Sequence, residues 1–346
     1  MGSIFNKKYH KKLMINKYIS TLVVAKTVIA AFTLYFFAIY LGWDMYNYPD
    51  FYLVFNKCSA DGYSNILYGK LFCSLNSITG MDFSHKSKIF ILIAMIINML
   101  LLIGYYKIFE KYLNKYGKYL IITLFVFHPY MNIYFFRFYT DLFACIGIFL
   151  MFYYTINNKK VDGFFILSAL ILINFRVALI PVFFLYSLLE IYQRFSKNDS
   201  TFRAIILLII SLSSLIPVLE FSMKFAQINS DLGLLYKITH NTIFTFGFRE
   251  AIANSVIGGG VFIAGNQFLD YLSFLVSISL LLVHVIGLIG IIKFSMNEKT
   301  LILVLFAYIA IPILTIAHMR YLLPLMPILL FGFTYLFFGR NKLRQL

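Results

Sequence analysis

The stretch LILINFRVALIPVFFLY, Leu170 to Tyr186, places an arginine in the middle of an apolar run and a proline five residues later. The whole run, 163–192, is too long for one comfortable membrane crossing and too short for two full ones. A charge at the centre of a span is costly, and proline breaks the hydrogen-bond ladder of a helix. We therefore expect two short helices that form a hairpin, with Asn174, Phe175 and Arg176 at the turn.

The rest of the chain has the composition of a membrane protein. Of its 346 residues 61% are hydrophobic and only 13% are charged, and the mean hydropathy is +0.83; soluble domains carry about 25% charged residues. We expect an all-α fold, a single transmembrane domain over 1–346 with about ten passes including the hairpin. The other expected spans are 19–42, 89–106, 119–136, 138–156, 204–222, 270–292, 300–317 and 321–339.

The distribution of basic residues predicts the orientation of these passes. With the N-terminus inside, the segments expected at the cytoplasmic side carry 19 of the 30 lysines and arginines. These segments are the N-terminal stretch, the loops 107–118, 157–162, 193–203 and 293–299, and the C-terminal tail. The net charge of +16 is then a property of cytoplasmic loops and does not indicate nucleic acid. Both termini are expected in the cytoplasm, and the two longest loops, 43–87 and 223–269, outside.

Two carboxylates follow the first expected span, in GWDMYNYPDFY, Gly42 to Tyr52. One interpretation is an aromatic belt at the lipid headgroups with solvated acids. The other is that Asp44, within two residues of the helix end, lies where little water reaches it and removes a proton from a sugar hydroxyl. Asp50 is a second candidate of the same kind.

Three arginines occupy separate turns on the expected external side, namely Arg137, Arg176 and Arg320. The planar guanidinium group matches phosphate oxygens with two parallel hydrogen bonds, so three of them together would hold a diphosphate. The structural alternative is that Arg137 pairs with Asp141, one helical turn further on, and that Arg320 extends to the membrane interface.

Further candidates lie in the same external regions. His318 is either a proton carrier or phosphate donor, or a structural residue. Arg249 lies in the charged centre of the glycine-rich 223–269 loop, which has the composition of a mobile lid. Cys58 and Cys73 could pair if their loop faces an oxidising compartment. The sequence has no metal-ligand spacing, nucleotide-binding loop or other cofactor motif, so no cofactor is expected.

Several segments resemble bacterial polysaccharide polymerases of the O-antigen Wzy and EpsG kind. The stretch after the first span, then DGYSNILYGKLFCSLNSITG (61–80), FFRFYTDLFACIGIFLMFYY (135–154) and the hairpin occur in the same order. HMRYLLPLMPILL (318–330) is similar to the last helix of the wider GT-C glycosyltransferases, which use lipid-phosphate sugar donors outside the cytoplasm. Arg249 and Gly260 have the Arg-to-Gly spacing of an external loop in some Wzy proteins.

The resemblance implies an O-antigen or related polysaccharide polymerase of the bacterial inner membrane, acting at the periplasmic face. Its substrates would be undecaprenyl-diphosphate-linked oligosaccharides, with Asp44 as the catalytic base. The three arginines would bind the diphosphate, and Tyr46 and Tyr48 the sugar rings. Membrane lipid and a chain-length regulator are candidate partners. Two alternatives stay open: a GT-C transferase that uses a polyprenyl-monophosphate sugar donor, and a flippase or other transporter of lipid-linked glycans.

Overall fold

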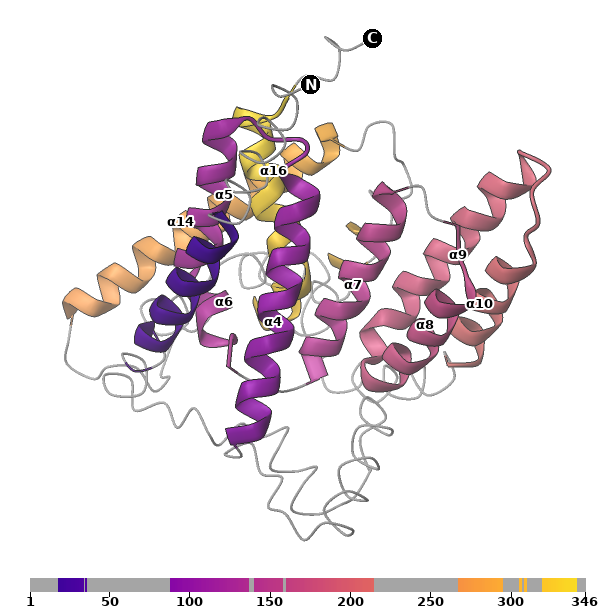
Figure 1. Cartoon of the computed structure of the whole chain (residues 1–346), viewed down its shortest axis with the longest axis horizontal. Helices are drawn as coiled ribbons and strands as arrows, with labels where there is room; N and C mark the ends of the chain where they lie inside the picture. The colour runs from indigo at the N-terminus through magenta and orange to yellow at the C-terminus, as the bar shows by residue number, and fades with distance from the viewer. Residues whose placement is uncertain are drawn as a thin grey trace, which may run out of the picture.

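The computed structural model describes residues 18–33, 35, 88–136, 140–157, 160–214, 267–294, 305–306, 308–309 and 319–340 (Figure 1). This part of the chain is helical and contains no strand, which confirms the expected all-α class for these residues. The α-helices are the N-terminal helix Tyr18–Thr33, α4 Lys88–Phe109, α5 Lys115–Phe127, α6 Pro129–Ile133, α7 Thr140–Ile156, α8 Gly163–Phe175, α9 Ile180–Phe195, α10 Phe202–Ser213, α14 Gln267–Phe294 and α16 Met326–Phe338. Two 3-10 helices, η2 Val177–Leu179 and η4 Met319–Leu325, precede α9 and α16.

The two short helices expected on either side of Arg176 are present. Helix α8 ends at the predicted turn, and α9 runs back from it. The ring of Phe165 in α8 lies 5.8 Å from that of Phe183 and 5.6 Å from that of Tyr186 in α9, and α10 packs against both helices. Outside the two helices, the Lys160 ammonium contacts the Asp199 carboxylate at 3.1 Å. Because Lys160 precedes α8 and Asp199 follows α9, this contact shows that the hairpin begins and ends at the same end of the bundle.

Two of the expected spans are wrong as single helices. The segment 119–136 breaks after Phe127, because Pro129 has no N–H to continue the ladder, and the short helix α6 follows. The segment 321–339 begins as the 3-10 helix η4, which contains Pro324, and becomes α-helical only at Met326. Both breaks lie in the same half of the bundle as the hairpin turn.

The helix directions agree with the expected alternation of passes. Helices α4 and α7 run parallel, since Tyr105 contacts Phe149 at 4.9 Å and Phe109 contacts Phe152 at 5.6 Å between ring centroids. Helix α5 begins after a short loop at the end of the bundle where α4 ends (Figure 1). Helices α14 and α16 are parallel, because Gly287 faces Leu329 and, one turn later, Gly290 faces Gly332.

The described loops that were expected to be cytoplasmic therefore gather at one end, here called the basic end. The backbone of Asn114 in the α4–α5 loop donates to Phe338 at the end of α16, at 3.1 Å, and Arg340 donates back to Tyr112 at 2.8 Å. The opposite end, here called the far end, holds the hairpin turn, the start of α7 and η4. The basic residues at the basic end are Lys107, Lys111, Lys115, Lys118, Lys160, Arg194, Lys197, Arg203, Lys293 and Arg340.

By length and composition, one helix of the described part is able to cross a membrane, over Ile91–Phe109 of α4. Six further apolar helical stretches in this part have 10–17 residues, among them Gly163–Phe175 and Leu322–Phe338. In Figure 1, α8, α9 and α10 form one side of the bundle, α4 and α7 the middle, and α5, α14 and α16 the other side. Helix α7 contacts α4, α8 and η4, and therefore links the two sides.

Candidate functional site

A buried ion pair joins the hairpin turn to the start of α7. A guanidinium nitrogen of Arg176 lies 2.9 Å from a carboxylate oxygen of Asp141, and their side chains are 10% and 0% exposed. The contact is an ion pair, and two opposite charges attract each other more strongly in a protein interior than in water. The carboxylate lies in the first turn of α7, where the helix dipole favours a negative charge.

The local sequence fixes the arginine at this turn. Arg176 ends α8 with an extended backbone; its N–H donates to Leu172 at 2.9 Å, and its carbonyl accepts from Leu179 at 3.0 Å. The neighbouring Phe175 stacks on Phe143 of α7, with ring centroids 4.1 Å apart. The turn is therefore held on both sides of Arg176, and the guanidinium group is directed to α7 with little freedom.

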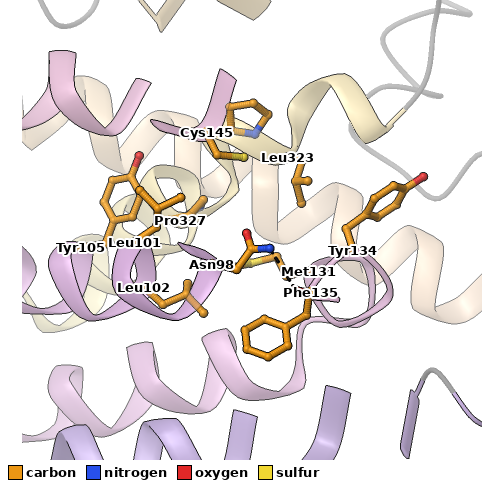
Figure 2. Close-up of a pocket in the computed structure, with 11 residues that line it drawn as sticks. Asn98, Leu101, Leu102, Tyr105, Met131, Tyr134, Phe135, Cys145, Leu323 and Pro327 are labelled. Atoms are coloured by element: carbon orange, nitrogen blue, oxygen red, sulfur yellow. Dashed lines mark hydrogen bonds between the residues drawn. The ribbon is translucent and has the colours of Figure 1, made fainter. Parts of the chain in front are cut away.

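An apolar cleft lies one helical turn from this ion pair, between α4, α6, α7, η4 and the start of α16 (Figure 2). In this view Cys145 and Leu323 lie on one side of the cleft, and Leu102 and Phe135 on the opposite side. Its empty space, including the part open to solvent, is about 400 Å³. The lining residues are Asn98, Leu101, Leu102, Tyr105, Met131, Tyr134, Phe135, Cys145, Leu323, Pro324 and Pro327.

Few polar groups line the cleft. The amide nitrogen of Asn98 donates to the Phe135 carbonyl at 3.0 Å, which ties α4 to the turn after α6. The hydroxyl of Tyr105 is buried and has no hydrogen-bond partner within the described part of the chain. A cleft with mainly hydrocarbon walls suits a slender apolar group better than a charged one.

A second buried polar cluster lies between the N-terminal helix, the α5–α6 break and α14. The Lys26 ammonium donates to the Phe125 carbonyl at 2.8 Å and to the Asn132 side-chain oxygen. His128 and His284 meet through their Nε2 atoms, 3.1 Å apart. Because Nδ1 of His128 accepts from the Met131 N–H at 3.3 Å, its Nε2 carries the proton and donates to His284.

This cluster was not predicted from the sequence. Lys26 lies within an apolar helix, and a lysine there is a signal that it has partners in the protein interior. Both histidines fall within expected spans. They are 156 positions apart, and no pattern in the sequence indicates that their side chains meet. Within the described ranges no group of three or more histidine, cysteine and acidic residues could hold a metal ion.

Of the predicted site residues, Arg176 is the one whose side chain the structure describes. Arg176 lies at the expected turn. Its partner is Asp141, the residue that the spacing in the sequence predicted as a partner of Arg137. Arg320 lies on η4, which packs against α7, although its side chain is outside the described part. Asp44, Tyr46, Tyr48, Asp50, Arg137, Arg249 and His318 lie outside the described residues, as do Cys58 and Cys73.

Comparison with known proteins found no match among family models, among curated proteins or among solved structures.

Proposed function

We propose that the chain is a polytopic protein of the bacterial cytoplasmic membrane that transfers glycosyl groups between lipid-linked glycans at the periplasmic face. The observation that carries this proposal is the position of Arg176, buried beside an apolar cleft at the end of the bundle opposite the basic loops. An always-charged group next to a hydrocarbon-lined cleft suits a ligand that has an anionic head and an apolar chain.

The short hairpin supports a site within the outer half of the membrane. Helix α8 has 13 residues, which at about 1.5 Å per residue rise about 20 Å, less than the roughly 30 Å of a bilayer's hydrocarbon core. If the basic end faces the cytoplasm and α8 begins at the inner boundary of the hydrocarbon core, the Arg176 turn lies in the outer leaflet, about 10 Å below the headgroups. Residues of a turn at this depth are tolerated when they are buried in protein, as Arg176 is.

The proposed reaction extends an undecaprenyl-diphosphate-linked glycan. Asp44 takes the proton of an acceptor hydroxyl, and the hydroxyl oxygen forms a bond to the anomeric carbon of the donor sugar. The bond between that carbon and the diphosphate breaks, and the lipid diphosphate leaves with the electron pair. Arg176, with Arg137 and Arg320, would stabilise the negative charge that develops on the leaving group. The role of Asp44 rests on its place in the sequence.

A deletion strain and one substitution test this function. We expect deletion to abolish the ladder of long surface polysaccharide while a single repeat unit remains attached to its carrier. Asp44→Asn should give the same pattern with a normal amount of protein in the membrane, because an amide cannot take the proton. Normal long chains in this variant would contradict the catalytic assignment. Loss of one side-branch sugar would indicate a single-sugar transferase, and accumulation of lipid-linked units on the cytoplasmic side a flippase.

The orientation has its own test. We expect a cysteine in place of Lys197, in a variant without native cysteines, to react with a membrane-impermeant thiol reagent only after the membrane is permeabilised. Lys197 is exposed and lies in the α9–α10 loop at the basic end. The matched control is Ser230→Cys in the long 223–269 loop, which should react in intact cells. Labelling of the Lys197 position from outside would reverse the proposed orientation of the hairpin.

A further inference from the structure

The break between α5 and α6 leaves two helix carbonyls in the interior without their usual donors. In a continuous helix the Phe125 carbonyl would accept from the N–H of residue 129, but Pro129 has none. The Val126 carbonyl would accept from the next N–H, and the change of direction at His128 interrupts that bond as well. A buried carbonyl without a donor is destabilising, so a helix break in the protein interior requires substitute donors.

Side chains supply both substitutes. Lys26, from the N-terminal helix, donates to Phe125 at 2.8 Å. Asn132, in α6, donates to Val126 at 3.0 Å and accepts from Lys26 through its side-chain oxygen. Lys26 is completely buried, and its ammonium lies 5.5 Å above the centre of the Phe135 ring. Two hydrogen bonds and an aromatic face therefore surround the ammonium group, which leaves it suited to hold structure and not to bind a ligand.

The break also determines one wall of the cleft. Three lining residues, Met131, Tyr134 and Phe135, belong to α6 or the turn that follows it. If α5 continued straight, these side chains would take other positions. The His128 side chain supports the same arrangement, since it accepts from the first turn of α6 and contacts His284 of α14.

We propose that Lys26 is a positioning residue for the cleft: it replaces the donor that Pro129 lacks, maintains the helix break, and so keeps the α6 wall in place. The inference concerns the shape of the cleft and does not depend on the proposed reaction. Lys26 and Pro129 come from different helices, and Lys26 is needed because residue 129 is a proline.

A double substitution tests this dependence. Lys26→Met should lower the midpoint of thermal unfolding by about 5 °C or more, since two buried acceptors lose a donor. In the Lys26→Met/Pro129→Ala protein, the alanine N–H supplies the Phe125 carbonyl, and at least half of the loss should be recovered. The control Lys26→Met/Pro181→Ala should recover nothing, because Pro181 lies in the first turn of α9, where its missing N–H deprives no carbonyl of that helix.

The shape of the cleft is measured separately, through the native thiol of Cys145, in a Cys58→Ser/Cys73→Ser background. We expect its rate of reaction with a small methanethiosulfonate to change severalfold in the Lys26→Met/Pro129→Ala protein, because a straightened helix moves the α6 wall. Failure of Pro129→Ala to recover stability would overturn the role of Lys26 as a substitute donor. Recovered stability with an unchanged Cys145 rate would overturn the role of the break in shaping the cleft.

Discussion

Replacement of Gly290 by alanine should strongly destabilise the protein, although alanine normally favours a helix. A Cβ atom at Gly290 would lie 1.9 Å from the Gly332 carbonyl oxygen, and one at Gly287 would lie 2.2 Å from the Leu329 oxygen. In the opposite direction, a Cβ at Gly332 would lie 2.1 Å from the oxygen of Gly287. All three obstacles are backbone atoms, so no side chain can rotate away. Helices α14 and α16 would have to separate.

The expected loss is about 3 kcal/mol or more in the free energy of unfolding, at the upper end of the range for overpacked interiors. It is measured by thermal or chemical unfolding of the purified protein, and Gly290→Leu should have a larger effect. The matched control is Gly163→Ala at the start of α8, where a new Cβ meets no atom within 4 Å. That variant should be as stable as the parent or up to about 1 kcal/mol more stable, since alanine restricts the unfolded chain. Equal behaviour of the two variants would show that α14 and α16 do not approach this closely.

Removal of one partner of the buried ion pair should have an effect of similar size. In Arg176→Met the Asp141 carboxylate stays buried without its charged partner, and the expected loss is about 3–5 kcal/mol. Asp141→Leu should destabilise for the converse reason, since it leaves the buried arginine without its charged partner. The double variant Arg176→Met/Asp141→Leu should lose much less than the sum of the two single losses, because no charge remains in the interior.

An exposed pair provides the control for this cycle. Lys160 and Asp199 also lie close together, but their side chains are 69% and 42% exposed, so Lys160→Met should cost less than about 1 kcal/mol. Additive losses in the Arg176 and Asp141 variants would contradict a direct interaction. Arg176→Lys tests the proposed function in the same position: lysine retains the charge without the planar fork, so chain extension should fall even where the protein remains folded.

The hairpin could be predicted because the relevant information is local. An arginine and a proline within a run of intermediate length allow few arrangements, and the basic loops on both sides of the run decide between them. The break at Pro129 has a local cause as well, but a proline in a long apolar segment is compatible with a kinked helix. What decides in favour of a break is Lys26, which lies more than 100 positions away.

The candidate site could be predicted only in part, for the same reason. The spacing of one helical turn predicted Arg137 as the partner of Asp141. The structure shows that Asp141 lies next to the hairpin turn and pairs with Arg176. Contacts between helices depend on their packing angles and rotations, which hydrophobic patterns do not specify when a helix is apolar on every side. The cleft and the histidine contact belong to this class.

Two contacts of the hairpin have a consequence for biosynthesis: the Lys160–Asp199 pair at its base and the Arg176–Asp141 pair at its turn. Helices of 13 and 16 residues are short for independent insertion into a bilayer, and an arginine at the centre of a lone span costs about 2.5–3.5 kcal/mol on insertion scales. If the chain inserts into a bilayer as proposed, a counter-charge is already there when the arginine emerges, because the ribosome produces Asp141 before Arg176. Helices α8 and α9 would then enter the bilayer together, as one unit guided by α7, which is synthesised just before them.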